Sequence, residues 1–347
     1  MNEEIKLLQK MIVKNLRSRA SISILVAFLL ISYFPYLFKP IMWIVAEKNE
    51  HVLEEIVQNL TKNATTDLEK AQRIYEWFSS GNNLVNVWWK QDEIIQAIPP
   101  LFIYKTPPHV CIRLVGHDYP LWVLTSRCGA CEEYALLYME MANKAGLKVR
   151  SIHNHGENHN WDEVYINGQW IVVDPSWPKF NETPAFYEYG RGLNISYVYA
   201  LYPNGSVEDV TTRYTDTGIV NIKVVDVNGN SVQGAVIKVT SNNYKPNWPS
   251  VILTCHANDT GECSFRVGGG NYTLKTYAGL FLFNKTNIIV KEGTQTNITI
   301  TLSRNIGASI IRYPLVIVIF LWLMLNVLVT ELQWVMRILK PKERTKQ

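Results

Sequence analysis

Two long apolar runs lie near the two ends of the chain. Residues 20–38 carry no charged side chain, residues 40–46 continue the apolar pattern, and residues 313–330 form a second uncharged run. About 20 apolar residues in a helix cross a hydrocarbon core that is about 30 Å thick. The first run is longer than the apolar part of a signal peptide, and no A-x-A cleavage site follows it. The pattern therefore predicts two transmembrane helices, an anchor at 20–46 and a second helix at 313–330.

Helical periodicity predicts two helices between these runs. Thr66 and Glu69 have the spacing of a capping box, and apolar residues recur behind them at helical spacing over about three turns. A second helix is predicted from Cys131 to Ala145, where a glycine follows and ends it. The aromatic and proline-containing residues 82–125 show no periodicity that assigns an element to them.

Strands are predicted in two regions by β-branched and alternating residues. After the second helix come three such runs, of which the last two are joined by Asn-Gly, a strong signal for a two-residue hairpin. These runs are Leu147–His153, Trp161–Ile166 and Gln169–Asp174. From about Thr217, short alternating runs separated by turns predict a small β-sandwich. We therefore expect an α+β domain at 47–215 and an all-β sandwich at 216–304.

Basic side chains are concentrated in the two terminal tails. Residues 1–19 and 331–347 each hold five Lys or Arg against two Glu, while the net charge of the whole chain is only +4. The part between the tails is slightly acidic, which argues against nucleic acid as a partner. Positive charge beside a transmembrane helix marks its cytoplasmic side. We expect a two-pass plasma-membrane protein in the lipid bilayer, with both tails cytoplasmic and residues 47–312 extracellular.

Asparagine sequons agree with an outward-facing middle of the chain. The N-x-[ST] pattern, which accepts N-linked glycans, occurs only between the two apolar runs. A segment rich in Asn and Thr also produces this pattern by chance, so that explanation stays open. The sequons begin at Asn59, Asn63, Asn181, Asn194, Asn204, Asn258, Asn271, Asn284 and Asn297. Their distribution predicts a glycoprotein with an extracellular domain.

Residues that could carry chemistry are concentrated between 127 and 174. Cys131 stands at the start of a predicted helix, where the helix dipole and free N–H groups favour a thiolate. His159 opens the first strand of the predicted hairpin, and Asp174 ends the second. A thiol nucleophile needs a base, and the base needs a carboxylate that orients it. The three residues are therefore a candidate Cys-His-Asp triad.

Other readings of the same residues stay open. Cys128 and Cys131, together with the histidines at 153, 155 and 159, could form a zinc site, although the histidine spacing is unusual for ligands. A thioredoxin-like redox pair lacks the βαβ context that it needs. The two cysteines could also be structural and carry no chemistry.

Disulfide pairing leaves one thiol over. The chain has five cysteines, so at most two bridges form. Cys255 and Cys263 flank a turn-like segment and are the first predicted pair. Cys111 with Cys128 is the second, which leaves Cys131 as the free thiol.

Several segments together resemble the transglutaminase-like superfamily, and more closely the peptide:N-glycanases. The likeness covers roughly residues 65–215 and rests on these motifs: 127–135 (RCGACEEYA), 159–164 (HNWDEV), Trp170, 174–175 (DP), 186–192 (FYEYGRG), 195–198 (ISYV) and 209–214 (DVTTRY). It implies a papain-like thiol-hydrolase core in which Cys131 is the nucleophile, His159 the base and Asp174 the orienting acid. Positions that line the glycan cleft in that family correspond to Arg150, Trp161, Glu163 and Trp170.

Two further features qualify the resemblance. Residues 217–303 are similar to carboxypeptidase-regulatory-like sandwiches. The zinc-binding cysteine pairs of cytosolic peptide:N-glycanases have no counterpart before Cys128, so we expect no metal and no cofactor. Cross-linking transglutaminases carry Trp directly after the nucleophile, whereas this chain has Glu132.

The sequence therefore predicts a membrane-anchored extracytoplasmic thiol amidohydrolase. Its expected substrate is a glycoprotein or peptide, cleaved at the amide between the glycan and Asn. The alternatives are a catalytically idle surface scaffold or adhesion protein with the same fold, and a cysteine peptidase or acyltransferase.

Overall fold

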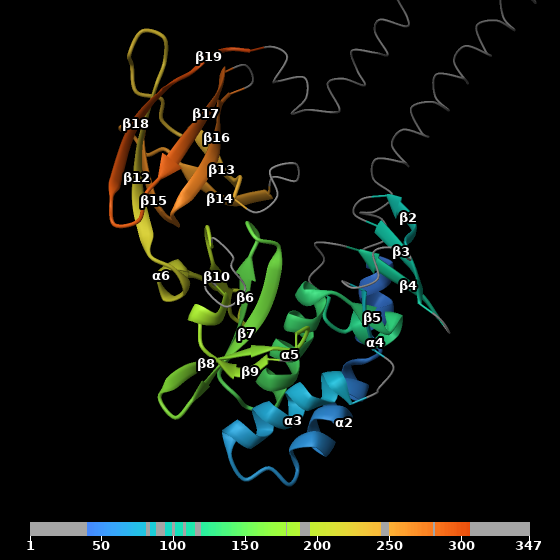
Figure 1. Cartoon of the computed structure of the whole chain (residues 1–347). Coiled ribbons are helices and arrows are strands. Elements are labelled where there is room, and N and C mark those ends of the chain that lie inside the picture. Colours follow the sequence, from blue (N-terminus) through green and yellow to red (C-terminus); the bar gives the residue numbers. More distant parts are fainter. Residues whose placement is uncertain are drawn as a thin grey trace, which may run out of the picture. The chain divides into compact units, whose positions relative to one another are not determined.

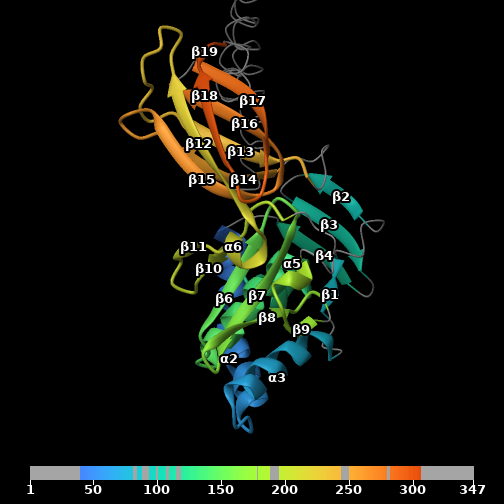
Figure 2. The same cartoon turned by 60° about the vertical axis from the view of Figure 1, so that its left-hand side comes forward.

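The computed structural model describes residues 40–80, 84–87, 94–98, 101–106, 109–114, 119–177, 179–187, 195–243, 250–279 and 282–305. By its contacts the chain divides into two units. Of the smaller unit, the structure describes little more than an antiparallel pairing in which Leu282 and Phe283 lie opposite Arg304 and Ser303. Of the elements in the described ranges, the larger unit contains the helices and nearly all of the strands (Figures 1 and 2).

Three helices pack together on one side of the main sheet. They are α2 (Glu50–Thr61), α3 (Asp67–Ser79) and α5 (Cys131–Lys144). The predicted start of α3 is confirmed, because the Thr66 hydroxyl accepts a hydrogen bond from the Glu69 amide at 3.1 Å. The Glu69 carboxylate accepts in turn from the backbone N–H of Thr65 at 2.8 Å. The predicted end of α5 is also confirmed, since Gly146 follows it with φ of +77°.

The main sheet has six strands in the order β11-β10-β6-β7-β8-β9. Its members are β6 (Val149–Asn154), β7 (His159–Ile166), β8 (Gln169–Asp174), β9 (Lys179–Glu182), β10 (Tyr199–Leu201) and β11 (Val207–Asp209). The predicted hairpin is confirmed: Ile166 pairs with Gln169, and Asn167 and Gly168 both have positive φ. This is the backbone conformation that a two-residue turn of the type I′ class needs.

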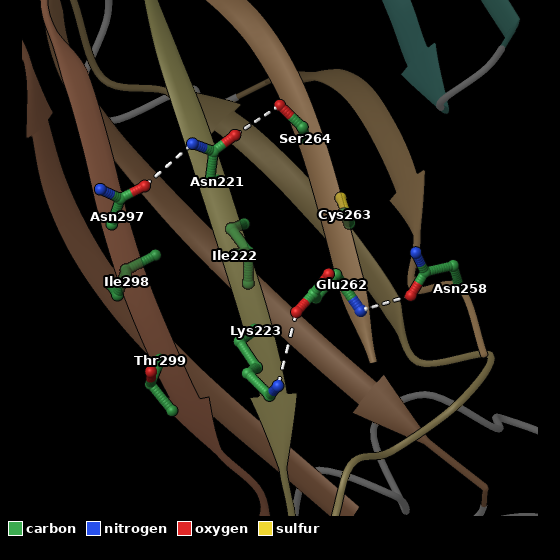
Figure 3. Close-up of a pocket in the computed structure, with 10 residues that line it drawn as sticks. All are labelled: Asn221, Ile222, Lys223, Asn258, Glu262, Cys263, Ser264, Asn297, Ile298 and Thr299. Carbon is green, nitrogen blue, oxygen red and sulfur yellow. Dashed lines mark hydrogen bonds and ion pairs between the residues drawn. The ribbon is translucent and has the colours of Figure 1, made fainter. Parts of the chain in front are cut away.

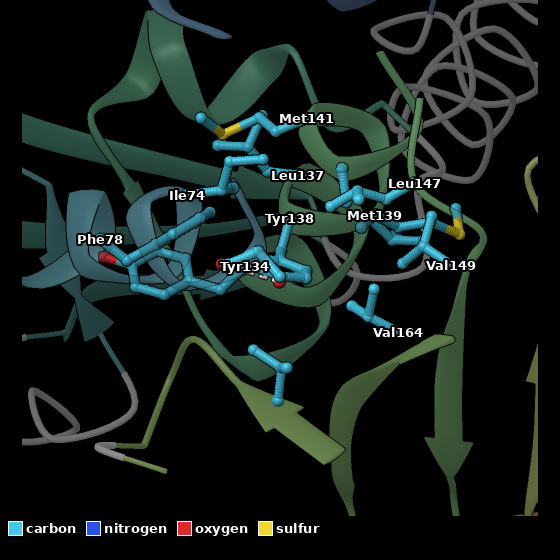
Figure 4. Close-up of a cluster of buried hydrophobic side chains, with 14 of the residues drawn as sticks. Ile74, Phe78, Tyr134, Leu137, Tyr138, Met139, Met141, Leu147, Val149 and Val164 are labelled. Atoms are coloured by element: carbon cyan, nitrogen blue, oxygen red, sulfur yellow. Dashed lines mark hydrogen bonds between the residues drawn. The ribbon is translucent and has the colours of Figure 1, made fainter. Parts of the chain in front are cut away.

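Side chains alternate between the two faces of this sheet and build two hydrophobic clusters. Val149, Val164 and Val173 face the helices and join a cluster with Tyr138 and Leu137 of α5 (Figure 4). Ile152, Trp161 and Val172 point to the other face and lie in a second cluster. Tyr187 and Tyr214, which are not on strands, complete this cluster. Both faces of the strands that carry the candidate site are therefore packed.

Residues 82–125, to which we assigned no element, contain several short elements. A three-stranded sheet has the order β2-β3-β4, and a short strand pairs in parallel with the strand before α5. The elements are β1 (Val85–Asn86), β2 (Ile94–Ile98), β3 (Leu101–Thr106), β4 (His109–Leu114), α4 (Trp122–Ser126) and, just beyond, β5 (Cys128–Gly129). The pairing of β1 with β5 joins segments far apart in the chain. The strands β2, β3 and β4 pair with their neighbours in sequence, but they show no strict alternation of apolar and polar residues that would have revealed them.

The β-rich region begins at Thr217, where the sequence pattern predicted the change. After the short α6 (Thr211–Tyr214), it forms one sheet in the order β15-β12-β18 and another in which β14, β13, β16 and β17 are neighbours, with β19 at its edge. The strands are β12 (Thr217–Val225), β13 (Val236–Ser241), β14 (Ser250–His256), β15 (Glu262–Gly268), β16 (Gly270–Ala278), β17 (Leu282–Val290), β18 (Gln295–Thr301) and β19 (Ser303–Arg304). The predicted likeness of this region to carboxypeptidase-regulatory-like domains is not confirmed.

Both predicted disulfides are present. Cys111 is bonded to Cys128 with a Cα–Cα distance of 5.9 Å, and Cys255 is bonded to Cys263 at 6.3 Å. These separations fall in the usual range for bridged cysteines. Cys131 is the free thiol, and it is buried.

The predicted membrane topology requires correction. Within the described ranges, no helix is long and apolar enough to cross a bilayer. This finding overturns the part of the predicted fold class that placed two flanking transmembrane helices, and with it the two-pass plasma-membrane localisation. Of the predicted segments, only residues 40–46 are described; there Met42 and Ala46 are buried against Trp122 of the protein itself. Residues 20–39 and 313–330 lie outside the described residues.

Candidate active site

Cys131 is the first residue of α5 and follows an extended residue, Ala130. Its side chain is 7% exposed. The turn before the helix is tight, with Arg127 at a φ of +56° and the strand β5 directly after it. The helix dipole at this end favours a negative charge on the sulfur. Local structure therefore places the thiol at the helix start, as the sequence predicted.

His159 and Asp174 are brought together by the hairpin. His159 begins β7, Asp174 ends β8, and the two strands pair antiparallel with Asp162 opposite Val173. The Nε2 of His159 donates to Oδ2 of Asp174 at 2.7 Å, and both side chains are buried. A two-residue turn thus joins a base and a carboxylate that are 15 residues apart.

The Asp174 carboxylate is held by donors on both of its oxygens. Oδ1 accepts from the backbone N–H of Ser176 and of Trp177, each at 3.0 Å, and from the Ser176 hydroxyl at 2.8 Å. Oδ2 accepts from the Tyr187 hydroxyl at 3.0 Å as well as from His159. A carboxylate with this many donors has a fixed orientation, which in turn orients the imidazole.

His159 carries its proton at neutral pH. Burial by itself lowers the pKa of this imidazole, but the Asp174 carboxylate, together with a hydrogen bond and the charge of Cys131, raises it to about 9. Cys131 is among the groups that raise this pKa, so its thiol lies near the imidazole. The structure therefore brings the three predicted triad residues together, while their catalytic roles remain a prediction.

The four residues predicted to contact substrate lie next to one another on β6, β7 and β8. Glu163 is fully buried and forms ion pairs with Arg150, at 2.7 Å, and with Arg213, at 2.5 Å. The Arg150 guanidinium stacks on the ring of Trp170, 4.1 Å from its centre. Trp170 is half-buried, whereas Arg150 and Glu163 present almost no surface to solvent.

Trp161 links this group of charges to the imidazole. Its indole N–H donates to the Tyr214 hydroxyl at 2.9 Å, and that hydroxyl donates to Glu163 at 2.8 Å. Its ring stacks on Tyr187 at 4.0 Å and lies 5.6 Å from the His159 ring. The structure therefore joins the four predicted residues in one network, of which Trp170 is the half-buried member. Contact with a substrate remains a prediction for them.

Sequence reasoning assigned no role to several residues at this site. Tyr187, which donates to Asp174, and Tyr214 come from outside the hairpin; both lie in motifs that carry the family resemblance, but no role was assigned to them. Arg113 of β4 lies beside the start of α5, because it pairs with Glu133. Only Glu133 had a local signal, since a Glu at the third helical position is typical of a capping box.

The disulfide at Cys128 bears on the zinc-site and redox-pair hypotheses. Cys128 is bonded to Cys111, so it is neither a thiolate ligand nor the redox partner of Cys131 in this structure. Among the residues that the structure describes, no group of three or more His, Cys, Asp or Glu side chains is arranged to hold a metal ion.

A hollow of about 490 Å³ lies elsewhere, on the sheet β15-β12-β18. Figure 3 shows its polar row, in which the Ser264 hydroxyl donates to Asn221 at 2.7 Å and the Asn221 amide donates to Asn297 at 2.9 Å. None of the predicted site residues lines it. It is separate from the candidate active site.

Comparison with known proteins assigns a class to the site. Residues 112–175, which include all seven predicted site residues, match the family described as "Transglutaminase-like superfamily". The chain therefore contains a transglutaminase-like domain over this segment.

Three relatives carry the name "Peptide-N(4)-(N-acetyl-beta-glucosaminyl)asparagine amidase". The Drosophila melanogaster protein is 36% identical over 96 residues, covering 27% of this chain and 15% of the relative. The Eremothecium gossypii protein is 36% identical over 104 residues, 29% of each chain. The Homo sapiens protein is 32% identical over 105 residues, 30% of this chain and 16% of the relative. This chain therefore spans less than a third of the length of these relatives.

Among solved structures, chlorocatechol 1,2-dioxygenase from Pseudomonas putida aligns with 26% of this chain and 61% of its own. The sequence identity is 11% and the TM-score 0.22. A likeness this weak supports no statement about fold or chemistry.

Proposed function

We propose that this protein is a cysteine-dependent amidohydrolase that cleaves the amide between a glycan and the asparagine of a peptide. The observation that carries the proposal is the buried His159–Asp174 pair, with a protonated imidazole adjacent to the free thiol of Cys131. The relatives named above carry the name of an amidase of N-acetyl-β-glucosaminyl asparagine, and the segment that matches the transglutaminase-like family contains these residues.

In the proposed reaction the Cys131 thiolate attacks the side-chain amide carbon of the glycosylated asparagine. His159 gives its proton to the nitrogen of the sugar as the C–N bond breaks, so the glycan leaves as an amine and the acyl group stays on sulfur as a thioester. The neutral imidazole then takes a proton from water, which attacks the thioester. The products are an aspartate in the peptide and the regenerated thiolate–imidazolium pair.

Negative charge develops on the amide oxygen in both steps. The backbone N–H of Cys131 at the start of α5 is the donor that we assign to this oxygen, because N–H groups in the first turn of a helix have no intrahelical partner. A preorganised donor of this kind is typically worth about 2.7–4 kcal/mol in the transition state.

Arg150, Trp161, Glu163 and Trp170 are assigned to the glycan side of the site. In support, they form one connected network with His159, and Trp170 is the member with the most exposed ring. A flat ring of this kind suits the apolar face of a sugar, while the buried Arg150–Glu163 pair holds Trp170 in place.

The proposal is tested with the full chain and a denatured N-glycopeptide in water enriched in ¹⁸O. We expect wild-type protein to release the glycan and to convert the linked Asn to Asp with one ¹⁸O atom, because water resolves the thioester. Cys131→Ser, which keeps the size of the side chain but not its nucleophilicity, serves as the matched control and is expected to lose the conversion. Mass spectrometry reads both products.

The other outcomes separate the alternatives. Cleavage of the peptide backbone would identify a peptidase, and transfer of the acyl group to an added amine would identify an acyltransferase. A folded wild-type protein whose glycopeptide stays unchanged would contradict the proposed function.

A further inference from the structure

A buried ion pair joins β4 to the first turn of α5, the helix that Cys131 begins, and takes no part in the proposed reaction. The Nε of Arg113 on β4 and Oε1 of Glu133 on α5 are 2.5 Å apart. The side chain of Arg113 is 14% exposed and that of Glu133 is 3% exposed. Burying two charges is costly unless they are well paired, so this pair needs an explanation.

Glu133 performs a second task with its other oxygen. Its Oε2 accepts a hydrogen bond from the backbone N–H of Ala130 at 2.9 Å. This bond caps the start of α5 and fixes the residue directly before Cys131. One carboxylate thus joins β4, through Arg113, to the turn that presents the nucleophile.

The disulfide reaches the same turn from the same strand. Cys111 and Arg113 are two residues apart on β4, and side chains at that spacing lie on one face of a strand. Cys111 is bonded to Cys128 and Arg113 pairs with Glu133, so the turn is held from both ends. The strand β4 also packs beside β5, which contains Cys128 (Figure 1).

The charged groups near the start of α5 come from three elements. They are His159 of β7, Arg113 of β4, and Glu132 and Glu133 of α5 itself. A buried carboxylate two residues from Cys131 opposes a thiolate by like-charge repulsion. Burial by itself lowers the pKa of Arg113, but the attraction of Glu133 and of Cys131 outweighs this and raises it. The guanidinium is therefore held in its charged form next to the first turn of α5.

We propose that Arg113 is a positioning residue for the nucleophile: it offsets the charge of Glu133, so that the carboxylate can cap the helix start without suppressing the Cys131 thiolate. The inference rests on the thiol chemistry of the proposed function and adds a residue to it. Nothing in the spacing of the sequence connects Arg113 with Cys131.

The test measures the rate at which iodoacetamide alkylates Cys131 as a function of pH. In Arg113→Gln we expect the midpoint of this profile to move upward by about 1 pH unit, so alkylation below the midpoint slows roughly tenfold. Arg113→Lys keeps the positive charge and should restore most of the rate.

A double variant separates the electrostatic role from a merely structural one. Glu133→Gln can still accept the bond from Ala130 but has no charge, so its midpoint should lie below that of wild type. Combining Arg113→Gln with Glu133→Gln removes both charges, and the midpoint should return close to the wild-type value. If Arg113→Gln acted only through a loss of packing, the double variant would alkylate more slowly than either single variant, and its midpoint would not return to the wild-type value.

Arg127→Gln is the matched control, because Arg127 is exposed and lies next to Cys128. Its removal changes the net charge equally and should leave the profile unchanged, since solvent screens exposed charges. A midpoint that Arg113→Gln does not move, or that the double variant does not restore, overturns the inference. The probe is iodoacetamide, so a failure to cleave glycopeptide would not affect this result.

Discussion

Two histidines on neighbouring strands have pKa values that are shifted in opposite directions. His159 has a buried carboxylate partner, and although burial lowers its pKa, Asp174 and Cys131 raise it to about 9. His153 on β6 is buried with neither ring nitrogen hydrogen-bonded within the described part of the chain, and burial, with the nearby His155, lowers its pKa to about 3. The same residue type thus carries charge in one place and not in the other, because only one location supplies a counter-charge.

This contrast predicts two separate windows in the pH dependence of stability. The pKa of His159 is higher in the folded state than the unfolded value of about 6.5, so its stabilisation is complete below pH 6.5 and is lost as pH rises toward 9. Relative to His159→Gln, wild type should lose about 3 kcal/mol of unfolding free energy across this window. Urea unfolding at a series of pH values measures it.

His153→Gln is the matched control for this measurement. The pKa of His153 is lowered on folding, so its contribution changes only between about pH 6.5 and pH 3, where stability falls as pH decreases. The variant should therefore follow the wild-type slope above pH 6.5. A parallel course of wild type and His159→Gln from pH 6.5 to pH 9 would contradict the His159–Asp174 ion pair.

At the scale of elements, the site depends on where α5 begins and ends. Its first residue is the candidate nucleophile, and Glu133 caps that end. Its other end is closed by Gly146, whose φ of +77° is one that residues with a Cβ rarely adopt. A Cβ at this position would meet no atom within 4 Å, so backbone strain alone opposes a substitution.

Gly146→Ala should lower the free energy of unfolding by about 1 kcal/mol because of this strain. Gly146→Asn should cost less, since Asn adopts positive φ more readily. Thermal or denaturant unfolding of the two variants checks the order. Equal stability of Gly146→Ala and wild type would show that the helix does not need this conformation to end.

At the scale of the whole molecule, the two disulfides lie in different regions, and each joins strands of two sheets. Cys111–Cys128 joins β4 to the turn before Cys131, whereas Cys255–Cys263 joins β14 to β15 in the β-rich region. Each closes a loop of fewer than 20 residues, for which chain entropy predicts about 3 kcal/mol of stabilisation. Their functional consequences should nevertheless differ.

Replacing both cysteines of each bridge by serine tests this difference. Cys111→Ser with Cys128→Ser should slow the alkylation of Cys131, because the turn loses one of its two attachments to β4. Cys255→Ser with Cys263→Ser should lower stability by a similar amount and leave the alkylation rate unchanged. Stability and the alkylation rate of Cys131 are measured on both double variants, so each variant is the control of the other. Equal alkylation rates in the two variants would contradict the proposed role of the Cys111–Cys128 bridge.

The sequence by itself determined features that depend on neighbours in the chain. The cap at Thr66, the end of α5 before Gly146 and the Asn167–Gly168 hairpin follow from local conformational preferences, and the structure confirms them. Cysteine parity and turn chemistry also predicted both disulfides. The hairpin then brought His159 to Asp174, because a two-residue turn leaves the strands little choice of register.

Only the tertiary structure decided which charges are buried and what balances them. It placed Arg150 and Glu163 inside the protein, brought Tyr187 to Asp174, and set Arg113 against Glu133 in the first turn of α5. It also packed Met42 and Ala46, which the apolar pattern assigned to a membrane anchor, against Trp122. An apolar pattern states that a side chain avoids water but not what covers it, and contacts between distant segments depend on the packing of the whole core.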